Sequence, residues 1–253
     1  MIQTIGKPFT ELTEVDSTNN YAMAKAQIGA AKWGETWFAH HQTKGKGSRG
    51  KTWNDSPGKN LMMSVLLPPD KLIFSQNFYI TATVALSAHD LFKKYTHEDT
   101  FIKWPNDVYW RDRKAGGILI ENSFRGNEWQ WCIAGIGINI NQTVFDSPVR
   151  NAVSLKQITG KTYDAVALAK ELCHCMQQRW NELQNDRQSI LKNYNDVLYK
   201  RNQTVTLKRG SIVFNGMIKS ADASGLLEVE SGSQLQHFTF GEIEWLLPER
   251  NAV

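Results

Sequence analysis

Four short stretches of the chain combine glycines with cationic, amide or carboxylate side chains, and the first is QTKGKGSRGKTW at residues 42–53. Alternating glycines let a backbone approach a ligand closely and aim its N–H groups at anionic oxygens. The interleaved cations would neutralise carboxylate or phosphate charge. A solvated basic turn would have the same composition. The loop is not a Walker A motif, because His40 and Gly47 occupy the positions where that motif needs glycine and serine or threonine.

The second stretch is Lys103-Trp104-Pro105-Asn106-Asp107, at the end of an expected strand. Its lysine, amide and carboxylate could bind phosphate, coordinate Mg²⁺ and orient a ligand. The same residues would also suit an ordinary turn. Chemistry and turn formation are therefore both compatible with this stretch.

The remaining two stretches lie in expected strands. In residues 112–121 a lysine enters a strand through two glycines, which fits either close approach of a ligand or a hairpin. Residues 135–141 read GIGININ and resemble a dinucleotide-binding fingerprint only superficially. No helix-opening pattern follows those glycines, so a Rossmann interpretation fails.

Apolar spacing predicts the elements that must position these stretches. Capping residues Asp16, Ser17 and Thr18 predict a helix over residues 21–26. Helical spacing follows Ser75 up to Phe92 and recurs over 164–183. Strands are expected at 36–41, 61–67, 101–104, 117–121 and 129–140.

The pattern changes near Tyr199, after which only short strands are expected. They lie at 204–208, 212–218, 226–230, 235–240 and 243–247. Five short strands separated by glycines are typical of a small barrel. We therefore expect a boundary near 195–202, with one domain over residues 1–198 and a β module over 199–253.

Composition narrows the class of protein. The 253 residues are 41% hydrophobic and carry a formal charge of +4, which permits an anionic ligand without demanding nucleic acid. Three cysteines argue against a disulfide framework and favour a reducing compartment. The first residues lack the apolar run of a signal peptide, and no stretch approaches a membrane span, so we expect a cytoplasmic protein without membrane contact.

Two candidate metal clusters are set aside. Cys173 and Cys175 are two apart on an expected helix and point away from one another, so burial is expected instead. His40 and His41 are neighbours on an expected strand and face opposite sides.

In this order and spacing, the four stretches resemble the biotin–protein ligase family. The glycine loop corresponds to residues 45–53, the KWPND element is intact at 103–107, and KAGGIL at 114–119 and GIGIN at 135–139 match two further motifs. Asp-Ser-Thr-Asn at 16–19 matches as well, and the resemblance covers about residues 10–247. It implies an α+β fold: a class II synthetase-like mixed sheet flanked by helices, with a C-terminal SH3-like barrel.

The resemblance also implies an activity, its ligands and the roles of individual residues. It implies an ATP-dependent ligase that activates biotin to biotinoyl-5'-AMP, with Mg²⁺, and transfers it to a lysine of a biotin carboxyl carrier protein. The biotin-binding residues would be Ser17, Thr18, Asn19, Gln42, Gly45, Lys46, Gly47, Ser48, Lys114 and Gly117. The ATP-binding residues would be Lys46, Trp53, Lys103, Asn106, Lys114 and Asn139, with Asn106 also at the metal. Lys114, Lys103 and Asp107 would be catalytic, the part of Asp107 being left open.

The chain departs from the family pattern in its loop. Lysine replaces arginine at Lys46 and Lys51, and Ser48 stands where arginine is frequent, so charge is kept at two positions but the bidentate fork is lost. Only Met1 to Thr13 precede the Asp16 motif, which is too short for the helix-turn-helix of bifunctional members. We therefore expect no sequence-specific DNA binding, and a monomer or weak homodimer.

Two alternatives stay open. A lipoyl-type acyl transferase or ligase would share the expected fold, and binding of biotin against lipoate would separate the two. A nucleic-acid-binding protein could use the basic loop and the small barrel. It would be favoured by aromatic side chains alternating with cations along the barrel, and the sequence does not have that pattern.

Overall fold

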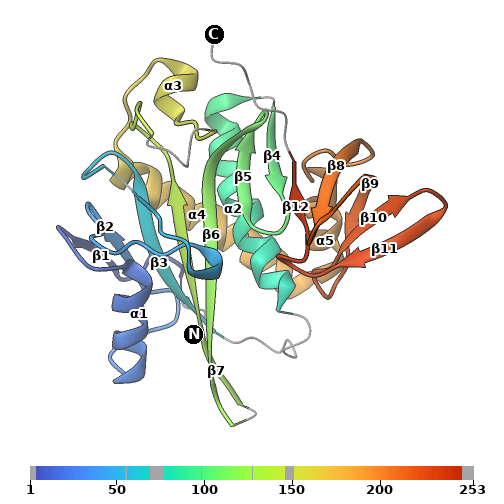
Figure 1. The fold of residues 1–253 in the computed structure, drawn as a ribbon. Helices are drawn as coiled ribbons and strands as arrows, with labels where there is room; N and C mark the ends of the chain where they lie inside the picture. Colours follow the sequence, from blue (N-terminus) through green and yellow to red (C-terminus); the bar gives the residue numbers. More distant parts are fainter. Residues whose placement is uncertain are drawn as a thin grey trace.

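The computed structural model of the chain describes residues 4–54, 56–68, 77–97, 99–126, 128–145 and 151–246. These residues form a seven-stranded mixed sheet with helices on both faces, followed by a five-stranded antiparallel sheet (Figure 1). The first sheet and its helices comprise β1 (Phe9–Leu12), α1 (Thr18–Gln27), β2 (Thr36–Ala39), a 3₁₀ turn (Ser48–Gly50), β3 (Leu61–Leu67), α2 (Phe78–Thr96), β4 (Thr100–Lys103), β5 (Asp107–Trp110), β6 (Arg113–Arg125), β7 (Glu128–Ile138), α3 (Leu155–Thr159), α4 (Ala165–Asn185) and α5 (Arg187–Asp196).

The large sheet has the order β1-β2-β3-β7-β6-β5-β4. Only β1 and β2 pair in parallel; every other neighbouring pair is antiparallel. Strands β3, β7 and β6 occupy the middle, which explains why β3 reads as a continuous apolar run and is buried throughout. The third and fourth glycine-containing stretches are therefore neighbouring strands, with Gly117 opposite Gly137.

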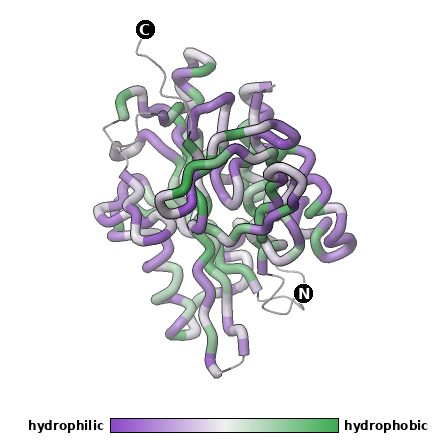
Figure 2. Tube along the Cα trace, turned by 45° about the vertical axis from the view of Figure 1, so that its right-hand side comes forward, coloured by the Kyte–Doolittle hydropathy of each residue, from purple (hydrophilic) through white to green (hydrophobic). Residues whose placement is uncertain are grey.

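Successive side chains of a strand point to opposite faces of the sheet, and this alternation divides the core into two clusters. On one face Val65 and Ala134 belong to the main cluster, together with residues of α2 and α4. On the other face Leu66 and Ile133 pack with Ala22 of α1. Hydrophobic segments run through the middle of the molecule (Figure 2). On the face that α1 covers, the hydrophobic cluster is small and lies next to that helix. The rest of this face is therefore free to form a binding site.

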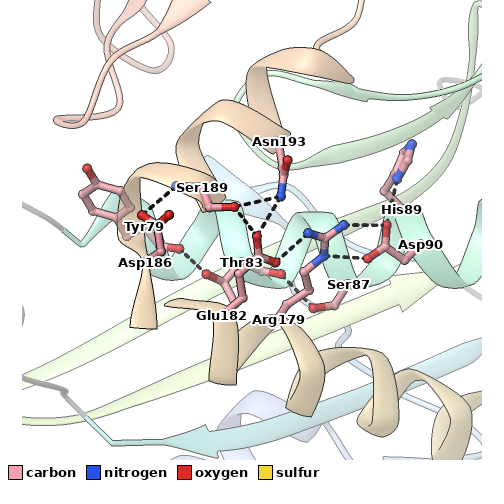
Figure 3. Close-up of polar contacts among 10 residues, drawn as sticks. All are labelled: Tyr79, Thr83, Ser87, His89, Asp90, Arg179, Glu182, Asp186, Ser189 and Asn193. Atoms are coloured by element: carbon pink, nitrogen blue, oxygen red, sulfur yellow. Dashed lines mark hydrogen bonds and ion pairs between the residues drawn. The ribbon is translucent and has the colours of Figure 1, made fainter. Parts of the chain in front are cut away.

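A polar network joins the helices of the other face (Figure 3). Arg179 of α4 donates two hydrogen bonds to Asp90 of α2, at 2.7 and 3.1 Å, and one to Glu182 at 2.7 Å. Asn193 of α5 also donates to Glu182, at 2.7 Å. Burial pushes the pKa of Asp90 upward, but bonds from His89 and Arg179 hold it below its ordinary value. The three helices are thus tied together as one layer behind the sheet.

The C-terminal part contains the five strands that the sequence predicts. They are β8 (Thr204–Arg209), β9 (Ile212–Ala221), β10 (Leu227–Ser231), β11 (Gln234–Phe238) and β12 (Glu244–Trp245). Their order is β11-β10-β9-β8-β12, so the sheet is open between its two edge strands, and a closed barrel is not confirmed. With only two residues, β12 is too short to close it.

Several short elements escaped the sequence analysis. β1 and β5 are four-residue strands, too short for a period of two to stand out. The helices over 18–27, 78–96 and 165–185 confirm those expected, although Ser75 lies outside the described residues. Cys173 is buried on α4 and Cys175 is half-buried, and within the described ranges no helix is long and apolar enough to cross a membrane.

Candidate active site

A pocket with about 480 Å³ of empty volume lies on the α1 side of the large sheet. It is bounded by the start of α1, Gln42 and the glycine loop that follow β2, and strands β5 to β7. Its lining comprises Ser17, Thr18, Asn19, Gln42, Lys46, Gly47, Ser48, Trp53, Asn106, Asp107, Lys114, Gly117, Ile118, Leu119, Gly135, Ile136 and Gly137. All four sequence stretches and residues 17–19 therefore meet in space around this pocket.

One end of the pocket is a set of hydrogen-bonded hydroxyl and amide groups. Ser17 precedes α1 in an extended conformation, so Thr18 and Asn19 occupy the first turn of the helix and are buried. The Thr18 backbone N–H donates to Gln42 Oε1 at 2.8 Å. The hydroxyl of Ser64 on β3 contacts Thr18 Oγ1 at 2.7 Å and Asn19 Oδ1 at 2.5 Å. These contacts fix the four side chains relative to one another.

Glu121 of β6 is a residue of this region to which the sequence analysis gave no role. Asn19 Nδ2 donates to its Oε2 at 2.7 Å, and Lys46 of the loop forms an ion pair with its Oε1 at 3.2 Å. Glu121 therefore connects the start of α1 to the glycine loop. The sequence contained a feature that could have identified Glu121: a carboxylate follows directly after an apolar run. In a strand this residue lies on the same face as Gly117 and Leu119. Ser64 gave a similar signal, as a hydroxyl inside LMMSVLL.

The other end of the pocket is charged. Lys114 enters β6 beside an irregularity in its pairing with β5, and its ammonium lies 2.7 Å from Asp107 Oδ1. Gly117 is next to this pair: a Cβ there would lie 3.2 Å from the carboxylate and 3.3 Å from the ammonium. Asn106 is held in place by its side-chain amide, which donates to the Ile118 carbonyl at 2.6 Å. The ammonium of Lys114 thus lies beside Gly117, where no side chain blocks access, and this arrangement suits an anionic group of a ligand.

Lys103 and Asn139 do not line this pocket. Lys103 lies over the rings of Tyr109 and Trp245, with its ammonium 5.1 and 5.4 Å from their centroids. Burial lowers its pKa to about 8. Asn139 is buried, and its amide donates to the carbonyl of Val153 at 3.3 Å and of Lys114 at 3.4 Å. Its visible contribution is to hold the backbone that carries Lys114.

The glycine loop folds back on itself over the pocket. The backbones of Lys46 and Thr52 form an isolated β-bridge. A Cβ on Gly45 would lie 2.4 Å from the Trp53 carbonyl, so only glycine at position 45 allows the two backbones to approach this closely. Ser48 to Gly50 form a 3₁₀ turn in which Arg49 has φ 56°, so this part of the loop is not extended. Ser48 nevertheless lines the pocket, whereas Arg49 turns away and donates to the Gly241 carbonyl at 3.2 Å.

Trp53 forms the wall next to β7. A Cβ on Gly137 would lie 2.6 Å from its ring, so the missing side chain of Gly137 makes room for the indole. Its Nε1 is buried and has no hydrogen-bond partner among the described residues. A buried N–H group without a partner is costly unless a ligand or water accepts from it. The indole therefore offers a donor at this wall of the pocket.

The comparison with known families concerns the same part of the chain. Residues 12–139, which carry every pocket residue, match the biotin/lipoate A/B protein ligase family. The chain belongs to this family.

Individual relatives extend the similarity beyond that match. The chain is 29% identical to the bifunctional ligase/repressor BirA of Bacillus spizizenii over 66% of its own length, and this match spans about half (52%) of the relative. It is 24% identical to the biotin–[acetyl-CoA-carboxylase] ligase of Mycobacterium tuberculosis, covering 92% of this chain and 86% of that one. The solved structure of biotin protein ligase from Aquifex aeolicus, in complex with biotin and ATP, has the same fold: TM-score 0.80, 24% identity, 94% of this chain and 98% of that chain covered.

Proposed function

We propose that the protein is a biotin–protein ligase that activates biotin with ATP to biotinoyl-5'-AMP and transfers biotin to a lysine of a biotin carboxyl carrier protein. One observation carries the proposal. A single pocket has neutral hydrogen-bonding groups at one end and the Lys114–Asp107 pair at the other, with glycine and aliphatic walls between them. Biotin has the matching chemistry: a neutral ureido ring, an apolar body and a terminal carboxylate. The names of the relatives above support the same assignment.

At the neutral end, Thr18, Asn19 and Gln42 would hydrogen-bond the ureido group. Such a group needs both donors and acceptors, which hydroxyl and amide side chains provide. Ser64 already holds Thr18 and Asn19, Glu121 holds Asn19, and Thr18 holds Gln42, so little conformational freedom would be lost when biotin binds. Leu119 would pack against the apolar body of biotin.

At the charged end, Lys114 would bind the biotin carboxylate and the phosphate oxygen that approaches it. Adenylation brings two anions together, so a fixed cation stabilises the transition state more than the separated reactants. A carboxylate oxygen forms a bond to the α-phosphorus, and the bond to the β-phosphate oxygen breaks, releasing pyrophosphate. Asp107 would keep the ammonium of Lys114 directed into the pocket.

The nucleotide would lie between Trp53 and the KWPND stretch, with Lys103 toward its phosphates. Magnesium fits at Asn106: its amide nitrogen is already bonded to Ile118, so its carbonyl oxygen is left for a hard cation. The ion would neutralise charge on the phosphates. Asn139 would act by supporting the Lys114 backbone.

The second half-reaction transfers the acyl group. A deprotonated lysine amine of the carrier attacks the acyl carbon of the mixed anhydride, an amide bond forms, and AMP leaves. The loop over residues 45–53 covers the pocket and would limit hydrolysis of the intermediate by water. Ser48 and Gly47, which line the pocket, would contact it there.

Other parts of the proposal concern organisation. We propose a division into residues 1–198, which carry the site, and 199–253, as a small SH3-like unit. We also propose a cytoplasmic protein that acts as a monomer or weak homodimer without sequence-specific DNA binding.

The test is to incubate the full chain with biotin, Mg²⁺ and ATP labelled at the α-phosphate. We expect labelled biotinoyl-AMP and an equal amount of pyrophosphate, and adding a carrier protein should convert the product to AMP. A parallel reaction with lipoate should give no adenylate. Adenylation of lipoate in place of biotin would overturn the choice of substrate, and no adenylate with either acid would overturn the ligase assignment.

A further inference from the structure

The ammonium of Lys103 is held between two aromatic rings from different parts of the chain. Tyr109 comes from the neighbouring strand β5, with its ring centroid 5.1 Å from Lys103 Nζ and its hydroxyl 3.4 Å away. Trp245 comes from β12 of the C-terminal sheet, with its centroid at 5.4 Å. Attraction of a cation to an aromatic face is stronger where the groups are partly removed from water, and Lys103 and Trp245 are both half-buried.

Trp245 is itself fixed by packing. Its ring lies 5.8 Å from that of Tyr199, which in turn lies 5.2 Å from the ring of Tyr109. Tyr199 is buried, and its hydroxyl donates to Asp112 at 2.6 Å. The backbone of Trp245 pairs with Leu207 of β8. The indole is therefore part of a rigid aromatic cluster between the two sheets.

Other contacts hold the C-terminal sheet against the site. Trp104 follows Lys103 in the sequence, and its Nε1 donates to the Gly225 carbonyl at 3.0 Å. Arg49 of the glycine loop donates to the Gly241 carbonyl, and a Cβ on Gly241 would lie 2.3 Å from the guanidinium. The C-terminal sheet thus touches both the loop and the KWPND stretch.

The charged groups that act on Lys103 do not explain its placement by themselves. Burial lowers its pKa most; Asp107 raises it, and Lys114 and Lys51 lower it. Within the described residues no carboxylate forms an ion pair with Lys103. A flexible four-carbon side chain without an ion-pair partner needs another restraint to stay in one conformation.

We infer that Trp245 is a positioning residue for the nucleotide: its ring holds Lys103 where the lysine meets the ATP phosphates, so the C-terminal sheet completes the ATP site. This rests on the proposed function, because it takes ATP as the ligand. The biotin end of the pocket contains no residue of the C-terminal sheet. We therefore expect a substitution of Trp245 to change the binding of ATP and not that of biotin.

The experiment compares three single variants of the full chain, together with Trp245→Leu in a Lys103→Met background. Trp245→Leu keeps apolar packing and removes the aromatic face, and Trp245→Phe restores a ring. Phe214→Leu is the matched control, because Phe214 packs against Phe238 in the same sheet and has no contact with Lys103. For each, thermal unfolding, the Kd of biotin, the Kd of α,β-methylene-ATP, and KM and kcat for ATP are measured.

We expect Trp245→Leu to raise KM for ATP and the Kd of the analogue roughly tenfold. The Kd of biotin and kcat should change less than twofold, and Trp245→Phe should recover most of the loss. In a Lys103→Met background, Trp245→Leu should have no further effect on the Kd of the analogue, because Trp245 acts through the lysine. Phe214→Leu should leave the two Kd values, KM and kcat unchanged.

Equal losses of biotin and ATP binding, or an undiminished effect of Trp245→Leu in the Lys103→Met background, would show a general structural role and overturn the inference. An unchanged KM for ATP in Trp245→Leu would also overturn it. Failure of the wild-type protein to form biotinoyl-AMP is a separate result, which contradicts the proposed function.

Discussion

Replacing Gly135 by alanine tests the geometry of the neutral end of the pocket. Gly135 lies on β7 and has no positive φ, so alanine introduces no backbone strain there. Its Cβ would, however, lie 2.2 Å from Asn19 Oδ1 and 2.8 Å from Asn19 Cγ. The Asn19 side chain is fixed on three sides, by Ser64, Glu121 and the Leu119 carbonyl, so it has to give up these bonds to move.

The magnitude follows from the hydrogen bonds that are lost. A buried polar group left without its partner costs about 1–3 kcal/mol. A loss of that size corresponds to a roughly 5- to 150-fold weaker affinity for biotin. Stability should fall by a similar free energy, because Asn19 is 3% exposed and its partners are left unpaired. The affinity for an ATP analogue should change little.

The assay is titration calorimetry with biotin, combined with thermal unfolding of the same samples. The matched control is the double variant Gly135→Ala/Asn19→Ala, in which the added methyl group enters the space that the amide has left. It should bind biotin as well as Asn19→Ala alone, so the two substitutions should be strongly non-additive.

Two results would refute this reasoning. Wild-type affinity in Gly135→Ala would mean that Asn19 is not held where the structure places it. A double variant much weaker than Asn19→Ala would mean that glycine is required at 135 for a reason other than space for Asn19.

Three further predictions concern the charged groups. Lys114→Ala should lower the rate of adenylation by at least about 100-fold with the fold intact, and near-normal pyrophosphate release from a folded variant would contradict its role at the carboxylate. Ser48→Arg should slow the release of preformed biotinoyl-AMP roughly tenfold. Arg49→Ala should speed release less than Lys46→Ala, because Arg49 contacts Gly241 and not the pocket. Fastest release from Arg49→Ala, together with no effect of Ser48→Arg, would contradict both expectations. With a pKa of about 8, Lys103 is charged at lower pH and loses its proton as the pH rises, so kcat/KM for ATP should fall above about pH 8. Lys103→Arg should move that fall to higher pH. An unchanged pH profile in the arginine variant would assign the titration to another group.

The sequence alone determined which segments matter and much of their local structure. Apolar spacing predicted the long helices and strand β3, because these patterns depend on residues near one another in the chain. The glycine-containing stretches and their order pointed to the family. Most of the residues assigned to ligands from that resemblance do line one pocket, Lys103, Asn139 and Gly45 being the exceptions.

Only the tertiary structure decided which distant residues meet. Ser64 and Glu121 belong to different strands and reach Asn19 because of the order β3-β7-β6, which no local pattern specifies. Likewise, the left-handed φ of Arg49 directs its side chain to Gly241, nearly two hundred residues later. Trp245 meets Lys103 for the same reason: strand pairing and sheet packing are contacts between segments far apart in the chain, and their register is fixed by the core as a whole.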